Sequence, residues 1–210
     1  MSIRRKEGAT LRLVQLALLT AIIVILQLTG TAIKLNILGT SVSLVLVPIV
    51  LGAMLLGPAS GAFLGFVFGL ITYLMGVFGA DTFTFLLFQD HPLITALICI
   101  VKGTAAGLCA GLVYRAVCGI QKKGASLAAT FLAAATAPVV NTGLFILGAL
   151  LVSDTLSANF VNAEAGETVI YFLVVVCAGI NFLLELALNL IAAPAIFRLY
   201  QAFAKRLSRK

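Results

Sequence analysis

Two charged side chains, Lys102 and Glu185, interrupt apolar stretches of the sequence that are each long enough to cross a membrane. A charge inside such a helix costs about 2.5–3.5 kcal/mol on insertion scales, so it is by default a candidate for ligand binding or ion transfer. Amide side chains, which both donate and accept hydrogen bonds, accompany them: Asn141, Asn181 and Asn189. These five are the candidate substrate-binding residues.

Helical spacing puts these side chains at similar depths. Lys102 and Asn141 lie about 15 and 16 Å from the ends of their stretches, and Glu185 lies about 20 Å from the opposite end of its own. All three can therefore share one layer near the middle of a membrane. Asn181, Glu185 and Asn189 are four residues apart, so one face of a helix presents them together.

Three interpretations of this polar layer remain open. Lys102 and Glu185 could form an ion pair that only holds helices together, because polar contacts between helices are common in membrane bundles. They could instead relay protons or ions in a stand-alone secondary transporter, although no inverted repeat or paired broken helix is visible. We favour a pocket for a small solute, since three separate stretches supply polar groups at one depth.

Catalysis and metal binding have little support in the sequence. His91 is the only histidine, and beside Asp90 and Pro92 it is typical of a helix start. One histidine supports neither a zinc site nor a serine triad at membrane depth. The phosphate-loop pattern GxxxxGK followed by Ser or Thr is absent, so no ATPase site is expected. The four cysteines lie in or at the end of apolar segments without a CxxC pair, and we expect free thiols.

The composition is that of an integral membrane protein. Of 210 residues, 62% are hydrophobic and 10% are charged, against about half and a quarter in soluble domains. We expect an all-α membrane protein, residues 1–210 forming one substrate-binding bundle of six transmembrane helices. The expected spans are Leu11–Thr29, Val42–Leu56 (which looks short), Ala59–Phe78, Pro92–Val117, Ser126–Val152 and Val169–Phe203.

The charges alternate between the two sides of this path. Twelve basic residues fall on one side: Arg4, Arg5, Lys6, Arg12, Arg115, Lys122, Lys123, Arg198, Lys205, Arg206, Arg209 and Lys210. The other side carries Lys34, Asp81, Asp90, Asp154, Glu164 and Glu167. The positive-inside rule predicts a multi-pass cell-membrane protein with both termini in the cytoplasm. The net charge of +7 thus indicates orientation rather than nucleic-acid binding.

The longer connections lie on the outer side, where binding residues and lids tend to occur. Four phenylalanines gather around the second of these connections: Phe78, Phe83, Phe85 and Phe88. They are equally typical of an interfacial aromatic belt and of an apolar lid over a ligand.

Small residues mark two helix faces. Gly57-Pro58 breaks the apolar run from Pro48 to Gly69, and beyond it glycines recur every four residues. Such a stripe lets membrane helices approach closely, which predicts a tight helical hairpin. In the first stretch, Ala17 and Ala21 are typical either of packing within the bundle or of a docking groove for a partner helix.

The six spans, the short basic N-terminus and Ala17-x-x-x-Ala21 occur together with two longer segments. These are VPIVLGAMLLGPASGAFLGFVFGL at 47–70 and INFLLELALNLIAAPAI at 180–196. Over essentially its whole length the chain resembles the substrate-binding S component of energy-coupling factor (ECF) vitamin transporters.

The resemblance implies a function without catalysis or cofactors. An S component captures a vitamin at the outer face, associates with a transmembrane coupling subunit and two cytoplasmic ATPases, and topples in the membrane to release the vitamin inside. Ala17 and Ala21 match the family's alanine motif that contacts the coupling subunit.

Within the family, the hairpin and the last span look most like the pantothenate and riboflavin branch. The absence of tryptophan disfavours branches that stack a thiamin or pterin ring on it. We favour pantothenate, because Lys102 could pair with its carboxylate, while Asn141 and Glu185 could bind its hydroxyl and amide groups. Riboflavin comes next, since it is neutral and calls for more aromatic lining.

Overall fold

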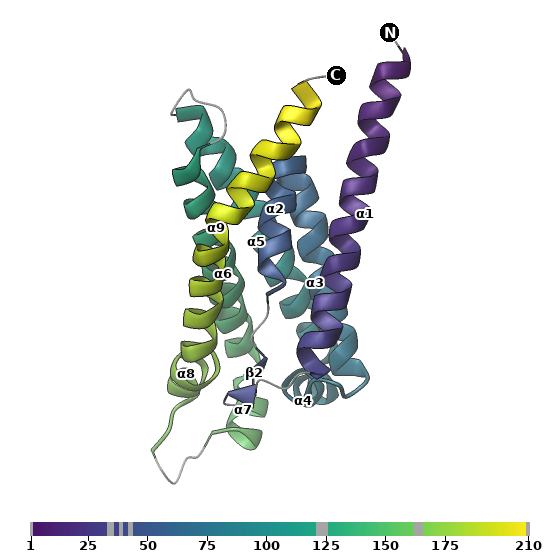
Figure 1. Cartoon of the computed structure of the whole chain (residues 1–210). Coiled ribbons are helices and arrows are strands. Elements are labelled where there is room, and N and C mark those ends of the chain that lie inside the picture. Colours follow the sequence, from purple (N-terminus) through teal and green to yellow (C-terminus); the bar gives the residue numbers. More distant parts are fainter. Residues whose placement is uncertain are drawn as a thin grey trace.

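The computed structural model describes residues 2–32, 36–37, 40–41, 44–120, 126–161 and 166–208. Apart from one small pair of strands, the described chain is a helical bundle (Figure 1). Its helices are α1 (Ser2–Ala32), α2 (Leu46–Leu56), α3 (Pro58–Val77), α4 (Thr82–Asp90), α5 (Pro92–Ile120), α6 (Leu127–Ala149), η1 (Leu150–Val152), α7 (Ser153–Asn159), α8 (Val169–Tyr171), η3 (Phe172–Cys177) and α9 (Gly179–Ser208). The strands β1 (Asn36–Ile37) and β2 (Thr40–Ser41) pair antiparallel.

Five helical segments are long and apolar enough to cross a membrane, among the described residues. They are Thr10–Gly30, Pro58–Val77, Pro92–Ile120, Leu127–Asn159 and Val169–Ala202. The expected span Val42–Leu56 corresponds to α2, which has 11 residues and is about 16 Å long. That is shorter than the roughly 20 residues of a full span, and residues 42–43 lie outside the described part. The helical membrane bundle is therefore confirmed, with five rather than six candidate spans in the part of the chain that the structure describes.

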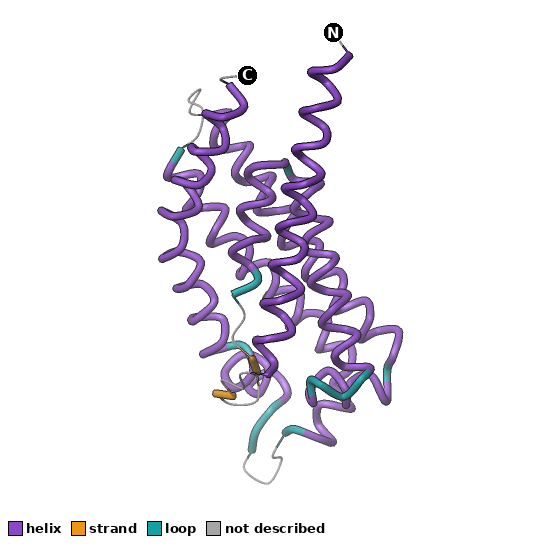
Figure 2. Tube along the Cα trace, turned by 45° about the vertical axis from the view of Figure 1, so that its right-hand side comes forward, coloured by secondary structure: helices purple, strands orange, loops and turns teal. Residues whose placement is uncertain are grey.

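The helices run alternately up and down the bundle. Figure 1 shows the N- and C-termini at one end, with α4, α7 and the strands at the other. The trace in Figure 2 shows the same arrangement from a different side. The polar residues predicted to share one layer therefore lie between the end that carries both termini and the end built from the short helices α4 and α7.

The break between α2 and α3 has a local cause. Gly57 has φ +101°, a backbone conformation that favours glycine, and Pro58 follows as the first residue of α3. The Gly57 N–H donates to the Ala53 carbonyl at 3.1 Å, which closes α2. A single residue, Gly57, thus connects the two helices of the predicted hairpin.

Helices α3 and α5 pack backbone to backbone. The glycine stripe of α3 faces a second stripe on α5, formed by Gly103, Gly107 and Gly111. A methyl group added at Gly61 would lie 2.5 Å from the Gly107 carbonyl oxygen, and one added at Gly111 would lie 2.7 Å from the Pro58 Cα. Both distances are too short for a real side chain, so only glycine permits this approach. The contact fixes α5, and Lys102 with it, against α3.

The apolar side chains divide between a buried core and a bare outer surface. The main core cluster includes Ile23, Leu46, Ile49 and Leu64, all fully buried. A smaller cluster at the other end joins Leu87, Leu156 and Leu173, among others. Large apolar side chains are exposed on every long helix: Leu13, Phe63, Leu97, Leu147, Leu183 and Ile191. Such a surface fits a helical bundle surrounded by lipid.

Candidate ligand-binding site

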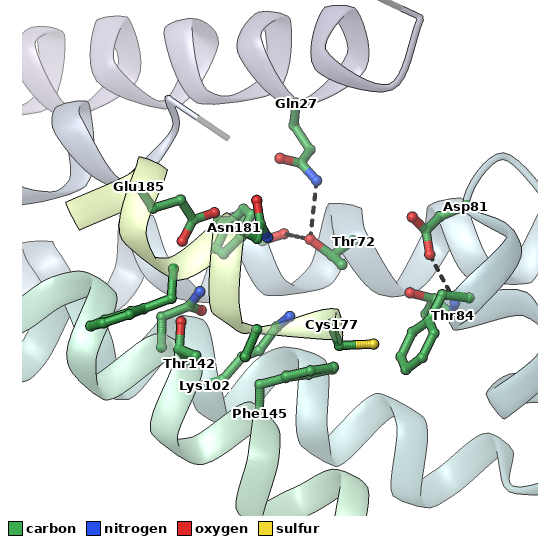
Figure 3. A pocket seen from close by; sticks show the side chains of 15 residues that line it. Gln27, Thr72, Asp81, Thr84, Lys102, Thr142, Phe145, Cys177, Asn181 and Glu185 are labelled. Atoms are coloured by element: carbon green, nitrogen blue, oxygen red, sulfur yellow. Dashed lines mark hydrogen bonds between the residues drawn. The ribbon is translucent and has the colours of Figure 1, made fainter. Parts of the chain in front are cut away.

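A cavity of about 110 Å³ lies among the long helices, near the end that carries α4 (Figure 3). It takes residues from α1, α3, α4, α5, α6 and α9 and from the end of η3. Its lining residues are Gln27, Phe68, Thr72, Asp81, Phe83, Thr84, Lys102, Asn141, Thr142, Phe145, Cys177, Ala178, Asn181, Phe182 and Glu185. The structure thus brings four of the five candidate polar residues around one cavity.

Lys102 is half-buried on α5, and the next residue, Gly103, packs against Gly65 of α3. Its Nζ lies 4.9 Å from the centroid of the Phe145 ring on α6. A cation over an aromatic face is attracted by the ring quadrupole. This contact directs the ammonium group toward α6, and the alternative of a helix-holding ion pair with Glu185 stays a prediction.

Two amide oxygens in the cavity wall have no hydrogen-bond partner among the described residues. They are Oδ1 of Asn141, whose side chain is 7% exposed, and Oδ1 of Asn181. A buried acceptor without a donor costs about 1–3 kcal/mol, the desolvation penalty of the group. Native structures rarely leave such groups unsatisfied without a reason. A ligand or water that donates hydrogen bonds would satisfy both acceptors.

The fifth candidate residue, Asn189, does not line the cavity. It is fully buried on α9, and its Nδ2 donates to the backbone carbonyl of Glu185 at 2.9 Å. Glu185 itself is buried and lines the cavity. The helix face carrying Asn181, Glu185 and Asn189 thus passes the cavity and continues beyond it.

The sequence interpretation missed several residues of the wall. Gln27 of α1 is buried, and its Nε2 donates to Thr72 Oγ1 of α3 at 3.2 Å (Figure 3). Asp81 begins α4 by accepting from the Thr84 N–H at 2.7 Å. A lone glutamine in an apolar helix was an available signal, whereas Asp81 looked like an ordinary outer-loop charge. Gln27 brings α1 into the site.

Aromatic rings cover much of the remaining wall. Phe145 packs on Phe83 with centroids 5.7 Å apart, Phe83 on Phe160 at 5.1 Å, and Phe160 on Phe172 at 5.6 Å. This row joins α6, α4, the residue after α7, and η3. Of the four phenylalanines near the second outer connection, Phe83 lines the cavity, while Phe78 is 81% exposed. The two interpretations thus divide between residues: Phe83 belongs to the cavity wall and Phe78 to the outer surface.

The segment before α9 is a π-helix, Phe172–Cys177, with wider turns than an α-helix. The Ala178 N–H closes it by donating to the Leu173 carbonyl at 2.9 Å. Cys177 and Ala178, at its end, line the cavity. Single π turns inside α-helices often occur at functional sites, and this one sets the rotation of Asn181 and Glu185.

The alanine pair lies on the outer side of the bundle. Ala17 and Ala21 are exposed on α1, whereas Leu19 and Ile23 of the same helix are buried. The exposed face is apolar and carries no other helix of the described chain. As regards metals, the described residues hold no group of three or more His, Cys, Asp or Glu side chains, and no disulfide joins the four cysteines.

Comparison of the sequence with known protein families indicates what kind of protein carries this cavity. A family model for the substrate-specific component of ECF transporters matches residues 11–197, which covers the larger part of every long helix. A search of curated proteins found no match. Members of this family are transport subunits that bind substrate and are not enzymes. The chain belongs to the ECF transporter substrate-specific component family.

Proposed function

We propose that this protein is the S component of an ECF importer and captures a small vitamin, with pantothenate first and riboflavin second. The vitamin binds in the cavity between α3, α5, α6 and α9, reached from the outer face. A transmembrane coupling subunit and two cytoplasmic ATPases then drive uptake. Family membership supports a substrate-binding subunit over a stand-alone transporter with a Lys102–Glu185 relay.

One observation supports the choice of ligand: a cation and two unsatisfied acceptors meet in the same cavity. The acceptors are the Asn141 and Asn181 amide oxygens, and the cation is Lys102. Their complement is a molecule that carries an anionic group together with hydroxyl or amide donors. Pantothenate carries a carboxylate, two hydroxyl groups and an amide N–H, so it matches all three.

Riboflavin remains the second candidate because the wall holds more aromatic surface than expected. Four phenylalanines line the cavity: Phe68, Phe83, Phe145 and Phe182. A flat ring system could stack on such faces. Riboflavin is neutral, however, and brings no carboxylate for the Lys102 ammonium to bind.

Aromatic side chains on short helices close one end of the site. The cavity, of about 110 Å³, holds several water molecules. We expect binding to displace the aromatic row, where short helices rather than long ones close the site.

The test is to identify the retained molecule. The protein is purified in mild detergent, and native mass spectrometry records the mass of any bound small molecule. Calorimetry then titrates the emptied protein with pantothenate, riboflavin and thiamine separately. Tight binding of pantothenate alone supports the proposal, whereas tight binding of thiamine or of no vitamin would overturn it. Co-purification of ATPase subunits supports the importer, and their consistent absence would favour the stand-alone transporter.

A further inference from the structure

A second cavity, of about 390 Å³, lies at the opposite end of the bundle from the vitamin site. It is bounded by α1, by the turn between α2 and α3, by α5 and by α9. This is the end where Figure 1 places both termini. The proposed vitamin function does not use it.

Two arginines from distant parts of the chain converge on this cavity. Arg12 comes from α1 and Arg115 from α5, and both side chains are exposed. None of the described residues lining the cavity is acidic. Both guanidinium groups bring positive charge to one cavity, and guanidinium matches phosphate geometry especially well.

A buried hydroxyl lines the same cavity. Tyr114 of α5 is 5% exposed, and its ring packs edge-on against Tyr200 at 5.5 Å. Its OH lies near the Tyr200 side chain and the Cys118 thiol, but it makes no hydrogen bond of good geometry to any described residue. Buried hydroxyl groups in native structures normally have a partner. Tyr114 can therefore turn its hydroxyl donor toward an anion beside the two cations, an observation that is separate from the charge pattern.

The surroundings indicate a lipid rather than a soluble anion. Leu11, Leu13 and Val14 are exposed on the turn of α1 that carries Arg12, and Met54 and Leu56 form an apolar part of the cavity wall. A phosphate group could sit at the arginines while its acyl chains follow α1. Basic pockets between membrane helices bind anionic headgroups in this way. We propose that this cavity binds the phosphate group of an anionic phospholipid.

The first test removes the charges. Native mass spectrometry in detergent titrates the full chain with phosphatidylglycerol and, separately, with phosphatidylcholine. We expect wild type to prefer phosphatidylglycerol, and the double variant R12Q/R115Q to bind it roughly 10- to 30-fold more weakly, from two lost cationic contacts. The matched control is Arg198→Gln, because Arg198 is exposed on α9 but does not line the cavity. Equal losses in control and double variant would show a general charge effect and overturn the proposal.

A second variant covers the case in which the double variant folds poorly. Tyr114→Phe keeps the packed ring and removes only the hydroxyl group, and we expect several-fold weaker binding of phosphatidylglycerol. Unchanged binding of phosphatidylglycerol in Tyr114→Phe would overturn the proposal, whether or not R12Q/R115Q folds. Inorganic phosphate is the last probe: if it displaces the lipid at equal concentration, the acyl chains contribute nothing and the site belongs to a soluble anion instead.

Discussion

Lys102 is the residue whose loss should separate the two vitamins. Lys102→Met keeps the apolar stem and removes the charge, so a carboxylate ligand loses a charge-assisted hydrogen bond of about 1.5–3 kcal/mol. We expect pantothenate affinity to fall about 10- to 150-fold and riboflavin affinity to change little. Calorimetry on the purified variant measures both. Unchanged pantothenate affinity together with a lower melting temperature would show that Lys102 only holds helices together.

The asparagines provide a matched pair at the same scale. Both side chains have an amide oxygen without a partner among the described residues, but Asn141 lines the cavity, whereas Asn189 lies outside it and donates to a backbone carbonyl of its own helix. We expect Asn141→Ala to weaken ligand binding about 5- to 10-fold, the loss of a neutral hydrogen bond of about 1 kcal/mol. Asn189→Ala should lower thermal stability and leave affinity within about twofold, since it does not reach the cavity. The reverse pattern in calorimetry and melting would exclude Asn141 from the site.

Residue-scale reasoning from the sequence found four polar residues of the cavity wall, because depth follows from counting residues along a helix. Lys102, Asn141 and Glu185 line one cavity, as equal depth suggests. Asn189 shares a face of α9 with Asn181 and Glu185 but does not line the cavity, because it lies about 12 Å along the helix axis from Asn181. Gln27 was missed, since the sequence does not show which helix faces the site.

At the scale of elements, the contact between α3 and α5 should tolerate no methyl group. Gly107→Ala would press a Cβ against the backbone of Gly61, and overpacking of this kind costs about 1–3 kcal/mol. Gly143→Ala is the control, because nothing lies within 4 Å of its added Cβ on α6. Melting is followed with a thiol-reactive dye, since the chain has four cysteines and no tryptophan. Equal melting temperatures for the two variants would mean that the stripes do not hold α3 and α5 together.

The exposed face of α1 should be needed for transport and not for binding. Replacing Ala17 and Ala21 together with leucine would hold a partner backbone away from this face, so we expect uptake in vesicles containing the ATPase module to be lost. Ligand affinity should stay unchanged. The control replaces the exposed Ala116 and Ala128 of α5 and α6. Survival of uptake would show that α1 is not the docking helix, and loss of ligand binding would show that this face supports the bundle rather than a partner.

Element boundaries were predictable where glycine or proline marks them, as at Gly57-Pro58. The π-helix was not, because Phe172–Cys177 reads as an ordinary apolar run. The second glycine stripe was visible in the sequence of α5, but spacing alone does not say which helix it faces. Helix α2 begins at Leu46, whereas the apolar pattern predicted a span that begins at Val42, so the helix is shorter than the predicted span.

For the whole molecule, the alternating charges predict that the termini face the cytoplasm. In a cysteine-free background we introduce Gly119→Cys at the end of the bundle that carries the termini and Ala158→Cys in α7 at the other end, both at exposed positions. A membrane-impermeant thiol reagent applied to intact cells should label position 158 and not 119, because the basic end stays inside. Labelling of 119 alone would invert the orientation and place the vitamin cavity toward the cytoplasm.

The backbone contact between α3 and α5 also divides the molecule into parts that can move and a part that cannot. Glycine against glycine leaves no side chains between these helices to change rotamer, so they behave as one rigid body that carries Lys102. The other half of the site, Asn181 and Glu185, sits on α9 behind a π turn, and α4 closes the end with short helical segments. We therefore expect the site to open by a shear or hinge motion of α4 and α9 against the α3–α5 pair. In the proposed complex, the charged end of the ligand would stay in place on Lys102, while Asn181 and Glu185 would move around its hydroxyl end.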